Sequence, residues 1–285
     1  MRVGRSEQKT ERTGLMEGIA DRIIIAAVAF SLIPILVMFN ASFSVMIDSF
    51  IFGRRGQSFS GLMSYVYLLR HTGFGDYVKN SLVLCALSIV LALALAIPAA
   101  YALSRYKFRG LNMFGILVVV PLLIPTISYF LPFAVTINEF EDRIGIKFYN
   151  SYNGYIILAI MYAVMYLPFS IWVIRGFMFS VPVDIEEAAR VDGCSTFGVF
   201  MRILLPLMSS GIIVTAVLHF MLVWDERLLV DVLMTDEKFR TVALWPSYDN
   251  MKFVSGPLSG IPILVIFFLV QKKFMKGITG GALKE

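Results

Sequence analysis

The side chains most suited to chemistry stand in one short run late in the chain. Trp224, Asp225 and Glu226 place an aromatic ring beside two carboxylates at the end of an apolar stretch. A flat ring can stack on a sugar face, and carboxylates accept hydroxyl hydrogen bonds that are stronger than neutral ones. Charges at this depth are costly in lipid and usually face a pathway or a partner. The run therefore indicates the polar lining of a solute path. The alternative is a structural ion pair of Arg227 with Asp225 or Asp231.

The patterns of enzymatic chemistry are absent from the sequence. No Gly-x-x-x-x-Gly-Lys-Ser/Thr phosphate loop occurs, so we expect no ATP binding or hydrolysis by that route. His71 and His219 are far apart, and no His, Cys and carboxylate residues stand at metal-ligand spacing. No Ser elbow or Cys–His arrangement rises above chance. We therefore expect a chain that is not an enzyme and that holds no metal or cofactor of its own.

The composition indicates a membrane protein. Of the 285 residues, 58% are hydrophobic and only 16% are charged, and the mean hydropathy is +0.77. A soluble domain is nearer half apolar and a quarter charged, so the excess implies lipid-facing surface. A net charge of +5 would suit nucleic acid, but a basic patch with stacking aromatics on a soluble fold is absent. We expect no nucleic-acid partner.

Six apolar runs predict an all-α polytopic membrane protein, because a helix needs about 20 apolar residues to cross the bilayer. The expected spans are 23–39, 82–103, 113–137, 155–174, 207–229 and 254–270. The third contains Pro121, Pro125 and Pro132, which predict kinks that are tolerated where a helix lines protein or water. Segments 1–22 and 276–285 flank the predicted membrane domain, which covers residues 23–275.

The basic residues are distributed unequally between the two sides of these spans. Fifteen Lys and Arg residues fall on the side of the termini and nine on the other, with Arg227 unassigned. Basic residues are enriched on the cytoplasmic side of membrane proteins. Both termini, and the charged stretch between the fourth and fifth spans, are therefore expected in the cytoplasm.

That charged stretch, residues 182–206, is named here the coupling stretch. Its helix-capping and turn residues predict two helices joined by a turn. Asp184 is expected to cap the first helix, with Glu187 as its third residue. Gly193 suits a left-handed C-terminal turn, and Ser195 can cap a second helix that runs to Pro206. A face of low relief is expected from residues at helical spacing: Ile185, Ala188, Ala189 and Asp192.

The coupling stretch resembles the EAA loop of the membrane subunits of ABC importers. The spacing in that family is Glu-Ala-Ala, three residues, Gly, nine residues, Ile, one residue, Leu-Pro. The matching positions are Glu187, Ala188, Ala189, Gly193, Ile203, Leu205 and Pro206. An ordinary amphipathic helix at the membrane surface, the alternative, does not require this placement of Gly and Leu-Pro. The resemblance implies that the first helix is a coupling helix between the fourth and fifth spans, which sits in a groove on a cytoplasmic ATPase.

Other segments look like those of maltose-type carbohydrate permeases. They are the end of the chain from Gln271 to Glu285, Asn80-Ser81 before the second span, and Trp224-Asp225-Glu226. Together they extend the resemblance from about Tyr77 onward. This chain has Asp225 and Arg227 where that group usually has Asn and Phe.

The resemblance implies a permease subunit of an ATP-driven importer for a carbohydrate. It implies a second permease subunit, two ABC ATPase subunits that bind ATP and magnesium, and an extracytoplasmic solute-binding protein. It also implies the cytoplasmic (inner) membrane of a prokaryote. By position, an outer loop reaches the binding protein, which makes Trp245, Pro246, Ser247 and Tyr248 docking candidates. The alternative for these four residues is an interfacial aromatic belt.

Two alternatives concern the transport class. An importer for another solute, such as a polyamine or a glycerol phosphodiester, would have the same architecture. A proton- or sodium-coupled secondary transporter would be favoured by an inverted repeat with ionisable residues at the midplane, and the sequence shows neither. A structural membrane anchor, from a third class, would not need proline-rich kinked spans.

Overall fold

The computed structural model of the chain describes residues 3–44, 47–48, 58–59, 61–107, 109–125, 127–245 and 252–282. These residues are almost entirely helical. The chain divides into two compact units. The first comprises Met1–Leu68 and Tyr248–Leu258, and the second comprises Leu69–Ser247 and Ser259–Glu285.

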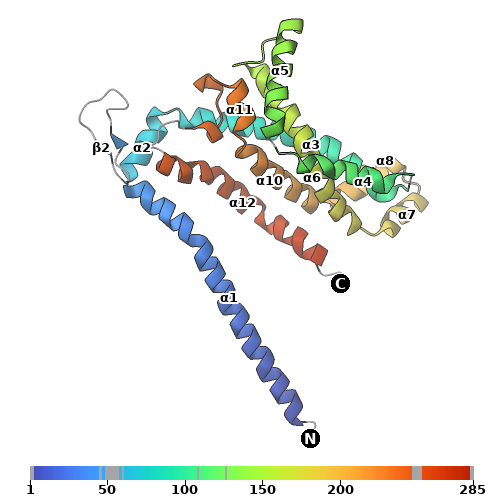
Figure 1. The fold of residues 1–285 in the computed structure, drawn as a ribbon. Coiled ribbons are helices and arrows are strands. Elements are labelled where there is room, and N and C mark those ends of the chain that lie inside the picture. The colour runs from blue at the N-terminus through green and yellow to red at the C-terminus, as the bar shows by residue number, and fades with distance from the viewer. Residues whose placement is uncertain are drawn as a thin grey trace. The chain divides into compact units, whose positions relative to one another are not determined.

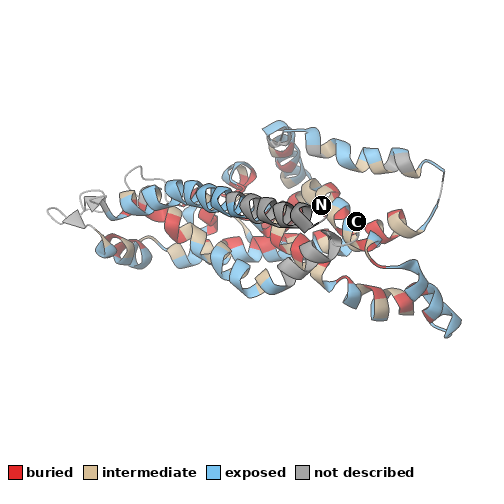
Figure 2. Ribbon diagram, turned by 90° about the horizontal axis from the view of Figure 1, so that it is seen from below, coloured by how far each residue is buried: buried red, intermediate tan, exposed pale blue. Residues whose placement is uncertain are grey.

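The first unit is dominated by one long helix, α1 (Val3–Ser44). Its segment Ala20–Phe43 is long and apolar enough to cross a membrane, and no residue in the most apolar part of it is buried, as the pale blue colour in Figure 2 shows. Bare apolar surface of this kind suits lipid. The unit also contains the two-residue strands β1 (Ile47–Asp48) and β2 (Ser58–Phe59), which pair antiparallel. It ends with most of α2 (Leu62–His71), whose Tyr65 hydrogen-bonds Ser42 of α1.

The second unit is built around two long helices, α3 (Phe74–Arg105) and α6 (Tyr152–Phe179), which lie side by side (Figure 1). The buried side of α3 carries small residues three or four positions apart: Ser81, Cys85, Ser88, Ala92, Ala96 and Ala100. Small side chains let helix backbones approach closely, which drives helix association in membranes, where lipid offers no hydrophobic contrast. Helix α10 (Ser209–Trp224) packs against both.

The expected third span, 113–137, is not one helix. It consists of α4 (Leu111–Val119), the 3₁₀ turn η2 (Val120–Leu123) and α5 (Ile127–Ile144). Helix α4 ends two residues before Pro121, and Pro125 lies between η2 and α5. Proline breaks helices because it has no backbone N–H to donate and its ring clashes with the preceding turn. Pro132, by contrast, lies inside α5. The sequence correctly indicated kinks here, and the crossing of a membrane by this segment as one span stays a prediction.

The expected fifth span, 207–229, also differs from the structure. The chain bends by 69° between Thr196–Leu207 and Ser209–Trp224, and α10 ends at Trp224. A separate short helix, α11 (Leu228–Leu233), follows. The other expected spans lie within α1, α3, α6 and α12 (Lys252–Ala282). Four described helices could each cross a membrane, and the bent pair could be a fifth crossing. The all-α membrane fold is confirmed, whereas the count of six spans stays a prediction.

Residues 236–245, named here the capping segment, cover the N-terminal ends of α3 and α6. They form two 3₁₀ turns, η4 (Glu237–Phe239) and η5 (Val242–Leu244). Asn80 donates from its amide to the carbonyls of Lys238 and Arg240, at 2.9 and 3.0 Å. Tyr155 of α6 donates its hydroxyl proton to the carbonyl of Phe239 at 2.7 Å. The segment is therefore fastened to both helices.

Candidate functional site

The coupling stretch begins with α7 (Val183–Val191), which starts two residues earlier than predicted. Pro182 occupies the N-cap position, so no side chain caps the helix. Asp184 lies inside the first turn, where its negative charge still suits the positive end of the helix dipole. The prediction that Asp184 caps this helix was therefore wrong.

The turn after α7 is the one that the sequence predicts. Gly193 has a φ of +87°, in the left-handed region that favours glycine. Its N–H donates to the carbonyl of Arg190, and the N–H of Cys194 donates to the carbonyl of Ala189, both at 3.0 Å. These two bonds form a Schellman motif, which satisfies carbonyls that the helix end leaves without partners. The requirement for glycine at this position therefore comes from the backbone.

The second helix of the stretch begins as predicted, at Ser195. Its hydroxyl accepts a hydrogen bond from the N–H of Gly198 at 3.1 Å. The helix continues through α8 (Thr196–Val199), a π-helical turn, η3 (Phe200–Leu204), and α9 (Leu205–Leu207). Leu204 is fully buried in an apolar cluster with Ala100 of α3 and Ile174 of α6. The seven motif positions are distributed along this path: Glu187, Ala188 and Ala189 in α7, Gly193 in the turn, Ile203 in η3, and Leu205 and Pro206 in α9.

The residues expected to share a face of low relief in α7 are not all buried or all exposed. Glu186 and Ala189 are buried, whereas Ile185 and Ala188 are exposed. Glu187 is exposed as well. Glu187 and Ala188 are therefore available to another protein, while the adjacent carboxylate points inward.

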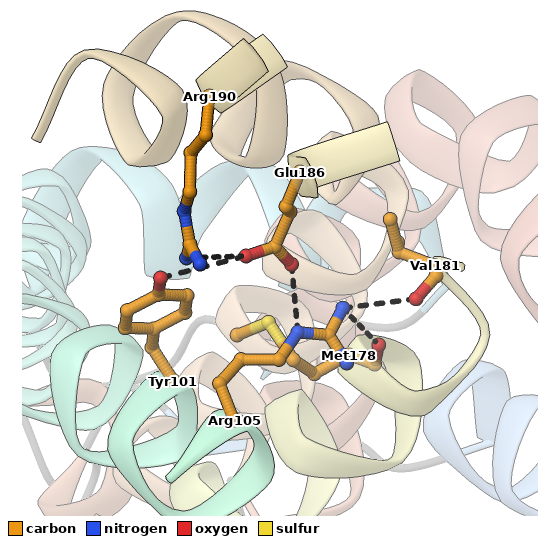
Figure 3. Close-up of polar contacts among 6 residues, drawn as sticks. All are labelled: Tyr101, Arg105, Met178, Val181, Glu186 and Arg190. Atoms are coloured by element: carbon orange, nitrogen blue, oxygen red, sulfur yellow. Dashed lines mark hydrogen bonds and ion pairs between the residues drawn. The ribbon is translucent and has the colours of Figure 1, made fainter. Parts of the chain in front are cut away.

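Glu186 is a buried carboxylate that the sequence analysis did not single out. Its carboxylate forms a 2.7 Å ion pair with Nε of Arg105, the last residue of α3 (Figure 3). A guanidinium nitrogen of Arg105 also donates to the carbonyls of Met178 and Val181, at 3.3 and 2.9 Å. Tyr101 donates its hydroxyl proton to the same carboxylate at 3.4 Å. One guanidinium thus joins the end of α3, the end of α6 and the start of α7.

The predicted solute-path residues are placed differently from one another. Trp224 is buried, stacks on Phe220 at 5.1 Å between ring centroids, and donates its indole N–H to the carbonyl of Ser259 at 3.2 Å. Asp225 is exposed. Within the part of the chain that the structure describes, no ion pair joins Arg227 to Asp225 or Asp231.

Glu226 performs a local structural task. Its carboxylate accepts hydrogen bonds from the backbone N–H groups of Leu228 and Leu229, at 2.9 and 3.2 Å. These groups open α11, so the carboxylate satisfies N–H donors that would otherwise have no partner. The hydroxyl of Tyr162, in α6, also donates to it. Glu226 therefore fixes the turn between α10 and α11 against α6.

A second polar group is buried farther along the same helices. His219 of α10 lies with its Nε2 2.7 Å from the hydroxyl of Ser88 and its Nδ1 3.5 Å from that of Ser170. Its ring is nearly perpendicular to that of Tyr166, with the ring centroids 5.7 Å apart. These contacts join α3, α6 and α10. No group of three or more His, Cys, Asp or Glu side chains is arranged to hold a metal among the described residues.

The docking candidates are only partly covered by the structure. Trp245 is buried, its ring lies 4.6 Å from that of Phe74, and its indole N–H donates to the hydroxyl of Thr72 at 3.2 Å. It therefore offers little surface to another protein. Pro246, Ser247 and Tyr248 lie outside the described residues.

Residues 88–280 match the family described as "Binding-protein-dependent transport system inner membrane component". The chain is 30% identical over 219 residues to the diacetylchitobiose uptake system permease protein DasC of Streptomyces coelicolor, covering 74% of this chain and 76% of that one. It is 29% identical over 240 residues to the trehalose/maltose transport system permease protein MalG of Thermococcus litoralis, covering 79% and 82%.

Among the solved structures that share the fold is the crystal structure of a bacterial ABC transporter involved in the import of the acidic polysaccharide alginate, with a TM-score of 0.63 and 20% identity. The match covers 92% of this chain and 98% of the other. The chain belongs to the family of inner membrane components of binding-protein-dependent transport systems.

Proposed function

We propose that the chain is the permease subunit of an ATP-driven importer that translocates a carbohydrate delivered by an extracytoplasmic binding protein. The observation that carries the proposal is the coupling stretch. It is folded as an exposed helix and a glycine turn, and it returns into the helix bundle through Leu204. The carbohydrate assignment is supported by the two relatives, whose names give diacetylchitobiose and trehalose or maltose as their solutes.

The complete importer would contain a second permease subunit, two ATPase subunits and the binding protein. ATP and magnesium would bind to the ATPase subunits. Glu187 and Ala188, exposed on α7, are proposed to contact an ATPase from the cytoplasmic side of the inner membrane. Closure of the ATPase pair on ATP would move α7 and change the tilt of the helices behind it. The solute path would then open outward.

We assign a narrower solute-path role to the run at the end of α10. Asp225 is exposed and can accept hydrogen bonds from sugar hydroxyls. Trp224 and Glu226 are held by contacts within the chain, so they act by positioning the α10–α11 turn. Pro246, Ser247 and Tyr248 remain the proposed docking residues for the binding protein.

The test is to purify the tagged chain with the untagged proteins encoded beside it. Mass spectrometry should identify two ATPase copies and a second permease. The assembly, reconstituted into vesicles with its binding protein, should take up labelled oligosaccharide only when ATP is present. Uptake of a polyamine or a glycerol phosphodiester instead would overturn the carbohydrate assignment. Uptake driven by an ion gradient without an ATPase would overturn the whole proposal.

One variant links this activity to the coupling stretch. Glu187→Lys reverses an exposed charge and should abolish uptake without loss of membrane insertion. Glu237→Lys makes the same reversal at another exposed position, in the capping segment, and serves as the matched control. If Glu187→Lys takes up as much solute as Glu237→Lys and the parent, Glu187 does not contact the ATPase.

A further inference from the structure

Arg105 and Glu186 form an ion pair that is almost closed to solvent. Their side chains are 8% and 2% exposed. The two charges lie at helix ends that suit them, because Arg105 ends α3 and Glu186 lies in the first turn of α7. Helix C-termini favour positive charge and N-termini favour negative charge. The pair is therefore supported by the backbone as well as by its own attraction.

The guanidinium of Arg105 also binds backbone carbonyls at the end of α6. The last carbonyls of a helix have no partner within it. Arg105 donates to the carbonyl of Met178, in the last turn of α6, and to that of Val181, just beyond its end. The rigid fork of a guanidinium can hold several acceptors in fixed directions, which the point charge of a lysine cannot do.

Apolar packing continues directly beneath this contact. Met178, Ala100 and Leu204 are fully buried in the same cluster, so α3, α6 and the second helix of the coupling stretch meet there. The ring of Tyr101 also contacts that of Phe200 at 5.2 Å. The start and the end of the coupling stretch are thus both fastened to the α3–α6 pair.

The opposite ends of α3 and α6 are fastened too. The capping segment is bound there through Asn80, Ser81 and Tyr155; the N–H of Val242 donates to the hydroxyl of Ser81 at 2.8 Å. Between the two ends, the small residues of α3 allow close packing against α6. The helix pair is therefore held at both ends and along its length.

We propose that Arg105 and Glu186 are positioning residues that make the coupling helix α7, the α3–α6 pair and the capping segment move as one body; this inference rests on the proposed function. Displacement of α7 by an ATPase then reaches the far side of the membrane without a hinge in between. A buried ion pair is poor support for stability alone, because well-packed apolar residues are often as good. The fixed geometry of the ion pair would instead keep the orientation of α7 relative to α3 and α6 constant as α7 moves.

The first experiment compares the assembled importer with variants of the pair. Glu186→Gln removes the charge and leaves Arg105 buried without its counter-ion. We expect the complex to assemble and hydrolyse ATP, with solute transported per ATP reduced about tenfold, within the usual range of coupling between sites. Glu186→Asp keeps the charge on a shorter arm and should recover part of the coupling. Glu139→Gln removes the carboxylate of an exposed i,i+4 pair in α5 and is the matched control.

The second experiment measures directly whether the coupling stretch and the capping segment move together. Spin labels are placed on Cys194, which is exposed, and on Glu237→Cys in the capping segment, with Cys85 replaced by Ala. The distance between them should be the same in the ATP-free and ATP-bound complexes. In Glu186→Gln, or in Arg105→Lys if the first variant does not assemble, the distance should change or broaden on ATP binding.

The outcomes separate this inference from the proposed function. If the wild-type complex transports solute but the label distance changes with ATP, the single-body inference is wrong and the function stands. The same holds if Glu186→Gln retains the wild-type ratio of transport to hydrolysis. A wild-type chain that assembles with no ATPase would overturn both.

Discussion

The contact between α6 and α10 gives a prediction whose magnitude follows from the structure. Gly211 of α10 faces Phe177 of α6. A Cβ atom added at Gly211 would lie 2.5 Å from Cγ and 2.7 Å from Cβ of Phe177. Because Phe177 Cβ is fixed to the backbone, rotation of the ring cannot remove the clash. Gly211→Ala therefore requires the two helices to separate.

The expected change in stability has two opposing parts. Overpacking of this kind typically costs about 1–3 kcal/mol. Alanine is also more favourable than glycine in a helix interior by about 1 kcal/mol, which offsets part of that cost. Gly176→Ala isolates the second part, because a Cβ there would meet nothing within 4 Å. The helix gain is common to both variants, so the difference between them should equal the overpacking cost of about 1–3 kcal/mol, or roughly 2–12 °C in Tm at about 2–4 °C per kcal/mol.

The native cysteines provide the assay. Cys85 is buried and Cys194 is exposed. With Cys194 replaced by Ser, a fluorogenic maleimide reacts with Cys85 only as the bundle opens, so a heating ramp in detergent gives Tm. Gly211→Ala should open first and Gly176→Ala should open at or above the parent temperature.

A double mutant checks the cause. In a Phe177→Gly background the opposing Cβ is gone, so Gly211→Ala should behave like Gly176→Ala. A penalty of unchanged size in that background would refute the steric reasoning. So would a Gly211→Ala protein as stable as Gly176→Ala in the parent background.

Two further predictions concern residues whose contacts the structure describes. Glu226→Gln should lower the unfolding free energy by about 1.5–3 kcal/mol, because its carboxylate accepts hydrogen bonds from Tyr162 and two backbone N–H groups. Asp225→Asn should keep Tm and impair uptake, and the reverse pattern would exchange the roles of the two residues. Cys194 should react with an impermeant maleimide in inside-out vesicles and stay unlabelled in intact cells, while the buried Cys85 stays unlabelled in both; labelling of Cys194 in intact cells would overturn the proposed orientation.

The parts of the coupling stretch that the sequence predicts correctly depend on local chemistry. Gly193 is required by a left-handed turn and Ser195 by a helix start, and both requirements involve atoms within five residues. The long spans are predictable for a similar reason, because an apolar run of sufficient length needs lipid or a core regardless of its neighbours.

The buried face of α7 was not predictable in the same way. Glu186 and Glu187 are adjacent and chemically identical, and the buried one is the one that meets Arg105, 81 positions away. A signal existed nonetheless: Glu186 stands three residues before Ala189, on the same helix face, and Arg105 ends an apolar run. Recognising the pair would have required knowing that α3 and α6 end side by side.

The helices of the second unit are interrupted at two places. The chain bends by 69° after Leu207, and it breaks into three pieces between Leu111 and Ile144. Pro121 and Pro125 remove backbone donors in the second case, while Pro206 stands just before the bend in the first. The α3–α6 pair also contains prolines, Pro98 and Pro168, yet each of these helices is continuous. Close packing between these two helices and hydrogen bonds at both of their ends therefore outweigh a single missing backbone hydrogen bond. Segments outside the pair, with fewer such constraints, are the ones that can bend when the pair moves.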